Sequence, residues 1–162
     1  MSNSDGASPA PLQKILIEEV ARLRDFLELL DQEQKALVKG DIERLMSLAA
    51  EKTELFGRLA KLGEARGKAL VAAGLAADRQ GMESWLETHG ELGSGKRDWL
   101  ELLALAKKAH TQNQTNGELI STRLANNQQA LSALMAAANQ ASLYGPDGQA
   151  HPLGVGRSLG SV

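Results

Sequence analysis

The chain has 162 residues, and 82 of them are Leu, Ala, Glu, Lys or Arg, a share typical of long helices or coiled coils. The strand-forming residues Val, Ile, Thr, Phe, Tyr and Trp are scarce, which nearly excludes a sheet-based fold and the enzyme classes built on sheets, and the length corresponds to one domain. A net charge of −2 leaves no basic surplus to neutralise phosphates, so nucleic acid is not an expected partner, and the absence of cysteine excludes disulfides and thiolate metal sites.

The N-terminal segment, residues 1–11, is predicted to be disordered. It is rich in Ser, Pro and Asn and lacks the apolar stretch of a signal peptide. No run of 18 apolar residues occurs in the sequence, so we predict no membrane span. Together these features favour a cytoplasmic protein.

An apolar stripe with the helical period begins at Leu12 and is still in phase at Leu48, so it crosses Gly40 without losing register. The stripe therefore predicts one long helix over about 12–73. Gly40 and Asp41 are also a suitable C-terminal glycine and N-cap pair, so a break between two helices at this point is the alternative.

Glycines interrupt the pattern between residues 74 and 95, where residues 82–89 are predicted to form a short helix. A second long stripe predicts a helix over 97–141, and the Gly- and Pro-rich residues 142–162 predict a flexible tail. The expected fold is all-α, with one helical-hairpin domain over 12–141. It is a long antiparallel helical hairpin, coiled-coil-like, with a short helix in its connector and disordered tails.

The second long helix is unusual because its later part is almost free of charge. Between residues 109 and 146 the only charged side chains are Glu118 and Arg123, and ten Asn and Gln residues stand in this stretch. Uncharged amides can be covered by a partner without the cost of desolvating full charges. The stretch 109–140 is either a partner-binding surface or an amide-rich seam that fixes the register of a coiled coil.

The candidate catalytic and metal-binding features are weak. Gly90 to Lys96 matches the first seven positions of a phosphate-binding loop, but Arg97 replaces the Ser or Thr that holds magnesium, and no strand precedes it. The three histidines have no metal-ligand spacing, and no Ser-His-Asp set is readable. We therefore expect neither an enzyme nor a cofactor nor a metal site.

Three segments in the C-terminal part resemble the FlgN family, the bacterial flagellar export chaperones. They are Asn113-Gln114-Thr115-Asn116-Gly117-Glu118-Leu119-Ile120, then Asn126-Asn127-Gln128-Gln129-Ala130-Leu131, then Leu143-Tyr144-Gly145-Pro146-Asp147-Gly148-Gln149. The resemblance covers most of 12–149 and is specific within about 113–149.

The resemblance implies a cytoplasmic chaperone for hook-associated (hook–filament junction) proteins, which it would deliver to the flagellar type III export gate. It implies that the C-terminal helix binds the substrate protein and that Tyr144 docks on the export gate protein FlhA. The residues assigned in this way to substrate-protein binding are Asn116, Leu119, Ile120, Arg123, Leu124, Asn127, Leu131 and Leu134. The alternative function is a self-associating coiled-coil adaptor or structural protein, in which the amide-rich stripe is an interface between copies of the chain.

Overall fold

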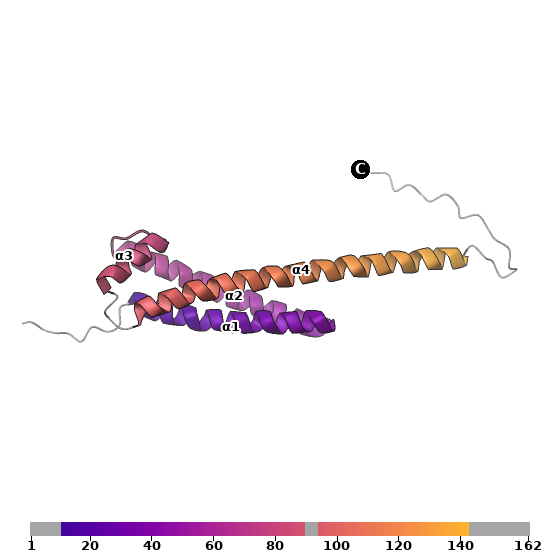
Figure 1. The fold of residues 1–162 in the computed structure, drawn as a ribbon, viewed down its shortest axis with the longest axis horizontal. Helices are drawn as coiled ribbons and strands as arrows, with labels where there is room; N and C mark the ends of the chain where they lie inside the picture. Colours follow the sequence, from indigo (N-terminus) through magenta and orange to yellow (C-terminus); the bar gives the residue numbers. More distant parts are fainter. Residues whose placement is uncertain (1–10, 90–93, 143–162) are drawn as a thin grey trace, which may run out of the picture. The chain divides into compact units, whose positions relative to one another are not determined.

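The computed structural model describes residues 11–89 and 94–142, and every element in these ranges is a helix. In chain order they are α1 (Pro11–Lys39), α2 (Ile42–Ala72), α3 (Arg79–His89) and α4 (Gly95–Ser142), shown in Figure 1. The expected all-α fold of long packed helices is confirmed, and α3 and α4 lie where a short and a long helix were predicted. Of the segments predicted to be disordered or flexible, 1–11 and 142–162, only Pro11 and Ser142 lie within the described residues, as the first residue of α1 and the last residue of α4.

The chain divides into two compact units, Met1–Glu118 and Leu119–Val162, and α4 contributes residues to both. In the described part of the chain, no helix is both long enough and apolar enough to cross a membrane.

The prediction of a single helix over 12–73 is wrong, because the chain turns at Gly40. Gly40 has φ +72°, a left-handed conformation that glycine adopts without the strain of a side chain. The N–H of Asp41 donates to Ala36 O at 3.0 Å, which closes α1 with a Schellman-type turn. The Asp41 carboxylate accepts from Arg44 N at 3.0 Å and caps α2.

The turn has a clear energetic reason, although the apolar stripe keeps its phase across it. A continuous helix would expose the whole stripe, whereas the turn lets the stripes of α1 and α2 bury each other. Leu30 of α1 and Leu48 of α2 are 0% and 1% exposed. Burying a leucine side chain contributes about 1.5–3 kcal/mol, far more than the turn costs.

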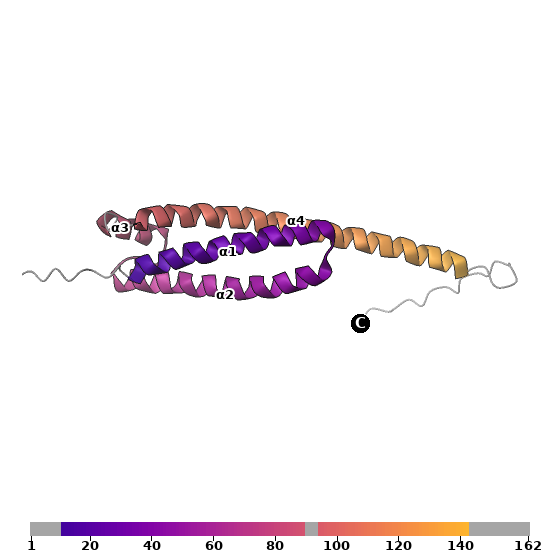
Figure 2. The same cartoon turned by 90° about the horizontal axis from the view of Figure 1, so that it is seen from below.

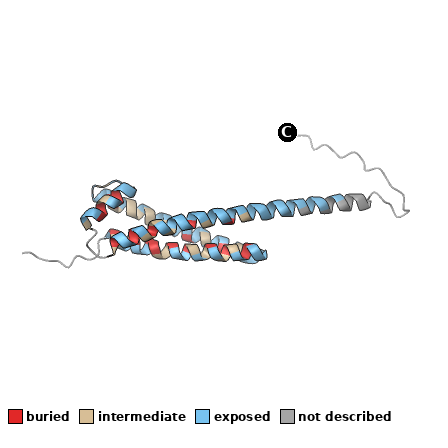
Figure 3. Cartoon of the chain, viewed as in Figure 1, coloured by how far each residue is buried: buried red, intermediate tan, exposed pale blue. Residues whose placement is uncertain are grey.

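The three long helices of the first unit share one core. Glu33 pairs with Lys52 and Glu19 with Arg66, so α1 and α2 are antiparallel (Figure 2). Arg24 pairs with Glu101 on α4, and further along both helices Asn116 donates to Leu30 O, so the first part of α4 runs in the same direction as α1. Figure 3 shows the buried residues gathered on the facing sides of these helices. The core includes Leu16, Leu23, Phe26 and Leu30 of α1, Leu55 and Leu70 of α2, Met82 and Trp85 of α3, and Trp99 and Leu102 of α4.

The short helix α3 is fixed at its beginning by a tight turn. The N–H of Gly81 donates to Asp78 Oδ1 at 2.9 Å, which caps the helix. A Cβ at position 81 would lie 1.8 Å from the carbonyl oxygen of Ala76, so only glycine allows this approach. The turn directs Met82, Trp85 and Leu86 into the core.

Candidate partner-binding surface

The α4 part of the first unit ends at a buried polar cluster, and Asn116 is at its centre. Asn116 is 0% exposed, and its Nδ2 donates to Leu30 O at 2.8 Å and to Glu33 Oε1 at 3.0 Å. The Lys52 ammonium lies 3.2 Å and 3.3 Å from the two Glu33 oxygens. The cluster therefore joins α1, α2 and α4 through the Asn116 amide nitrogen, the Glu33 carboxylate and the Lys52 ammonium, while the buried Oδ1 of Asn116 has no hydrogen-bond partner among the described residues.

This geometry corrects one residue of the predicted substrate-binding set. The Asn116 amide is occupied inside the bundle, where it cannot meet a partner while the bundle is closed. We therefore assign Asn116 to the stability of the bundle rather than to the partner surface.

A second buried polar group joins the same helices closer to α3. Glu19 is 4% exposed, and Arg66 Nε lies 3.0 Å from its Oε2. The Arg66 guanidinium is 5.2 Å from the ring centroid of Trp99, within cation–π range. Burial raises the pKa of Glu19, and the charge and hydrogen bond of Arg66 oppose that rise without cancelling it.

The second unit begins at Leu119, and three of its large apolar side chains on α4 are exposed. Ile120 is 45% exposed, Leu124 57% and Leu131 58%, and Asn127 is also exposed. At 3.6 residues per turn, these four side chains fall within an arc of about 60°. We call Ile120, Leu124, Asn127 and Leu131 the α4 face.

The other predicted residues lie around or beyond this face. Leu119 is half-buried, and the exposed Arg123 is about 60° around the helix from Ile120. The side chain of Leu134 and the whole of Tyr144 lie outside the described residues. The structure thus brings the α4 face together on one helix, while its role in binding stays a prediction.

A second exposed apolar face lies on α2, and the sequence stripe did not reveal it. Its residues are uncharged and exposed for about five turns, with Ile42 70%, Met46 71% and Phe56 64% exposed. At 3.6 residues per turn they fall within an arc of about 80°, and Leu48 and Leu55 of the core lie about 120–140° away from Ile42 around the helix. A search for a second apolar stripe at this offset would have found them. We call this set the α2 face: Ile42, Met46, Ala49, Thr53, Phe56 and Ala60.

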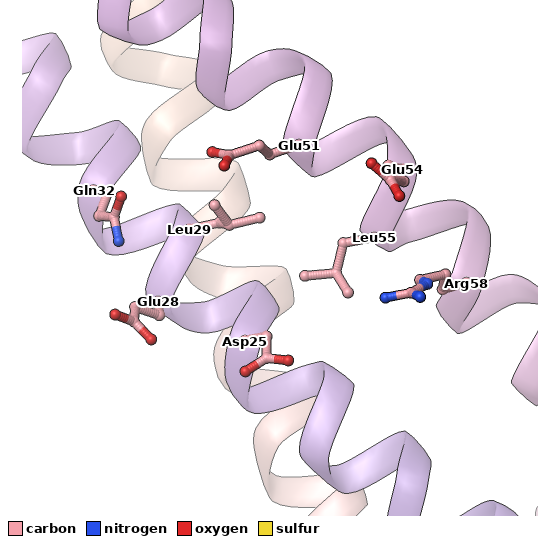
Figure 4. A pocket seen from close by; sticks show the side chains of 8 residues that line it. All are labelled: Asp25, Glu28, Leu29, Gln32, Glu51, Glu54, Leu55 and Arg58. Carbon is pink, nitrogen blue, oxygen red and sulfur yellow. The ribbon is translucent and has the colours of Figure 1, made fainter.

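The groove between α1 and α2 has a different character. It has a volume of about 360 Å³, and Figure 4 shows Leu29 and Leu55 reaching toward each other across it. The surrounding side chains are mainly acidic, namely Asp25, Glu28, Glu51 and Glu54, with Gln32 and Arg58. The groove is therefore a polar surface depression above the apolar contact between α1 and α2.

The histidines and the glycine-rich loop considered for catalysis or metal binding lie in ring-stacking, exposed or helix-starting positions. The His89 ring stacks on Trp85 with centroids 4.7 Å apart, and His110 is exposed on α4. In the described ranges, no group of three or more His, Asp or Glu side chains is placed to hold a metal ion. Most of the candidate phosphate-binding loop, residues 90–93, lies outside those ranges, and Gly95 and Lys96 belong to the first turn of α4.

Comparison with known proteins gives one family and one similar solved structure. A family model described as "FlgN protein" matches residues 8–152 of the chain. The chain is also similar to a crystal structure described as a flagella synthesis protein FlgN of Pseudomonas aeruginosa, with 26% sequence identity and a TM-score of 0.62. That match covers 70% of this chain and 89% of the other. No curated protein matches the chain.

Proposed function

Because the chain belongs to the FlgN family and so takes part in flagellar synthesis, we propose that it is a non-enzymatic export chaperone. In this proposal it works in the cytoplasm, binds hook-associated (hook–filament junction) proteins and delivers them to the flagellar type III export gate. The chaperone acts by binding alone, so it needs neither a catalytic step nor a cofactor.

The observation that carries this proposal is the α4 face. Three bulky apolar side chains, Ile120, Leu124 and Leu131, are each about half exposed on one side of a helix. Scattered exposed apolar residues are normal, but an aligned row of them is typical of a helix that binds a partner. An amphipathic segment of the client protein would bury this row.

The surroundings of the row support the same proposal. The exposed neighbours Asn126, Asn127, Gln128 and Gln129 are amides rather than ions. A partner that covers amides avoids the desolvation of full charges and can use the amides as hydrogen-bond donors and acceptors. The surface is therefore suited to holding and releasing a client.

Docking on the export gate is a separate part of the proposal. We assign it to Tyr144, which follows α4 in the sequence, and the gate partner is FlhA. Client binding by the α4 face and gate docking by Tyr144 would then use different residues, so that one chain can hold its client while it reaches the gate.

Calorimetry with the full-length chain and the terminal segment of a hook-associated protein tests the proposal. We expect saturable binding at a ratio of one chaperone to one client. Absence of binding to every hook-associated protein of the same organism would refute the chaperone function. Light scattering on the free chain tests the coiled-coil adaptor alternative, since a zipper-like adaptor must be oligomeric at the concentration at which it works.

A further inference from the structure

We infer that the buried cluster of Asn116, Glu33 and Lys52 is a latch, a polar contact that holds part of α4 closed and releases it reversibly. The part released is 106–118, the last residues of α4 in the first unit, which detach from α1 and α2 while the rest of the unit stays folded. This local opening is a property of the free chain, so it holds whether or not the chain binds a client.

The attachment of α4 weakens step by step along its length. Leu102, Ala109 and Asn116 are all buried, and because they are seven residues apart they lie on one side of the helix. The buried group changes from a large apolar side chain to a methyl group and then to a polar amide. Since the stabilisation from burial scales with the apolar area removed from water, its hydrophobic part falls at each step. The Asn116 end is therefore held least.

The packing of α4 between Leu105 and Asn116 is sparse. Ala109 is the one buried residue of this stretch, Gln112 is half-buried, and the others are exposed. A groove of about 400 Å³ lies beside it, lined among others by Ala109, by Phe26 of α1 and by Phe56 of α2. A surface that is incompletely filled makes fewer dispersion contacts, so detachment of this stretch loses little packing energy.

The polar cluster opposes opening less than an apolar contact of the same size would. In the closed form, the buried Oδ1 of Asn116 lacks a hydrogen-bond partner among the described residues, and on opening it gains water. The Lys52–Glu33 ion pair joins α2 to α1 and does not involve α4. Glu33 therefore keeps its counter-charge when Asn116 leaves, and only the two bonds from the Asn116 Nδ2 to Leu30 O and Glu33 Oε1 are exchanged for water.

The backbone of the same stretch is weakly helical. Thr111, Asn113 and Thr115 are poorer helix formers than the Leu, Lys and Ala residues before them. Gly117 directly follows Asn116, and a Cβ there would meet nothing within 4 Å, so close packing does not require glycine at this position. A glycine inside a helix lowers the stability of that helix. The stretch that is held least is thus also the one that bends most easily.

Thiol reactivity measures the opening directly, because the chain has no cysteine of its own. In the full-length chain, Ala109→Cys places a thiol at the buried contact of the released stretch. Val20→Cys is the control for the core, since Val20 is buried in α1, and Ala104→Cys gives the rate of an exposed thiol on α4. We expect an aromatic disulfide reagent to react with Ala109→Cys at least about a hundredfold faster than with Val20→Cys.

The urea dependence of these rates separates local opening from global unfolding. Local opening exposes little surface, so the Ala109→Cys rate should change little at low urea concentrations, whereas the Val20→Cys rate should rise steeply. Equal rates with the same steep urea dependence at both positions would overturn the inference, because position 109 would then be exposed only by global unfolding. This comparison leaves the latch residues unchanged.

A substitution in the latch tests the role of Asn116 itself. In the Ala109→Cys chain, Asn116→Asp keeps the shape of the side chain but places a carboxylate beside that of Glu33. We expect the reaction to become at least about tenfold faster, while Asn113→Asp, at an exposed amide of the same helix, changes it less than about twofold. Equal rates in the two variants would overturn the inference. An equal rise at positions 109 and 20 would do so too, since Asn116 would then act on global stability alone.

Discussion

Asn116 donates a hydrogen bond to Glu33 across the interior of the bundle, from Nδ2 to Oε1 at 3.0 Å. Asn116 is fully buried and Glu33 is 6% exposed, so water does not compete for this bond. Lys52 neutralises the Glu33 carboxylate from the other side. Lys52 of α2, Glu33 of α1 and Asn116 of α4 are therefore linked in one polar cluster that connects the three long helices. Asn116 lies two residues before the end of the first unit.

Replacing Asn116 should destabilise the bundle without touching its surface. Asn116→Ala removes one donor from the buried Glu33 carboxylate and should lower the free energy of unfolding by about 1–3 kcal/mol. Urea unfolding followed by circular dichroism measures this loss. Asn113→Ala is the control, because Asn113 is an exposed amide on the same helix and its removal should change stability by less than about 0.5 kcal/mol. Equal stability of the two variants would contradict the assignment of Asn116.

Two glycine-to-alanine substitutions should have opposite effects on stability. Gly40 has φ +72°, so Gly40→Ala should cost about 1–2 kcal/mol in the left-handed conformation. Gly57 is inside α2, and a Cβ there would meet nothing within 4 Å. Gly57→Ala should therefore stabilise the chain by about 0.5–1 kcal/mol. Thermal unfolding of both variants checks the signs, and a destabilising Gly57→Ala with a neutral Gly40→Ala would place the turn elsewhere.

The buried Glu19 should make stability depend on pH in a definite direction. Its pKa is above the ordinary value of 4.5, because burial disfavours the carboxylate more than Arg66 favours it. The folded chain then binds the proton more tightly than the unfolded chain does. The contribution of Glu19 to the free energy of unfolding is therefore largest at low pH and falls as pH rises from the ordinary pKa through the raised one.

Comparison with Glu19→Gln isolates this contribution. We expect the stability of the unmodified chain, relative to Glu19→Gln, to fall as pH is raised from about 4.5 and to become constant above the raised pKa. Urea unfolding at several pH values measures the difference. A difference that grows with pH would mean that Arg66 outweighs burial.

Substitution of Tyr144 should separate gate docking from client binding. Tyr144→Ala should leave calorimetric binding of the client unchanged and reduce the amount of hook-associated protein exported into the medium. Tyr144→Phe, which keeps the ring, serves as the matched control. Loss of client binding in Tyr144→Ala to the same degree as loss of export would contradict the division between the two sites.

The helical class and the positions of α3 and α4 could be predicted because Leu- and Ala-rich periodicity decides them locally. The helical phase of the apolar stripe alone could not distinguish a turn at Gly40 from one continuous helix. A stripe that keeps its register is compatible both with one helix and with two helices that fold onto each other. The decision depends on the core buried between α1 and α2, where Leu30 and Leu55 belong to one apolar cluster that the turn brings together.

The burial of the polar residues could not be predicted from residue type, because Glu and Asn are usually exposed to solvent. Glu19 and Glu33 belong to an evenly mixed set of charges, which is the usual pattern of a solvated helix. The angular position of Glu19 around the helix did indicate burial, because it lies only about 20° from the core residue Leu30. The burial of Asn116 was not readable either, since its partners are 83 and 86 residues away in sequence.

The central claim, that the α4 face binds a hook-associated protein, is tested most directly by calorimetry with the Leu124→Glu/Leu131→Glu double variant of the full-length chain. The control is Ile17→Glu/Val38→Glu, which places the same charges at exposed apolar positions of α1, 49% and 68% exposed. Since each buried leucine contributes about 1.5–3 kcal/mol, we predict that the α4 double variant binds the client at least about a hundredfold more weakly. The control should bind as the unmodified chain does. Unchanged affinity in the α4 double variant would contradict the claim.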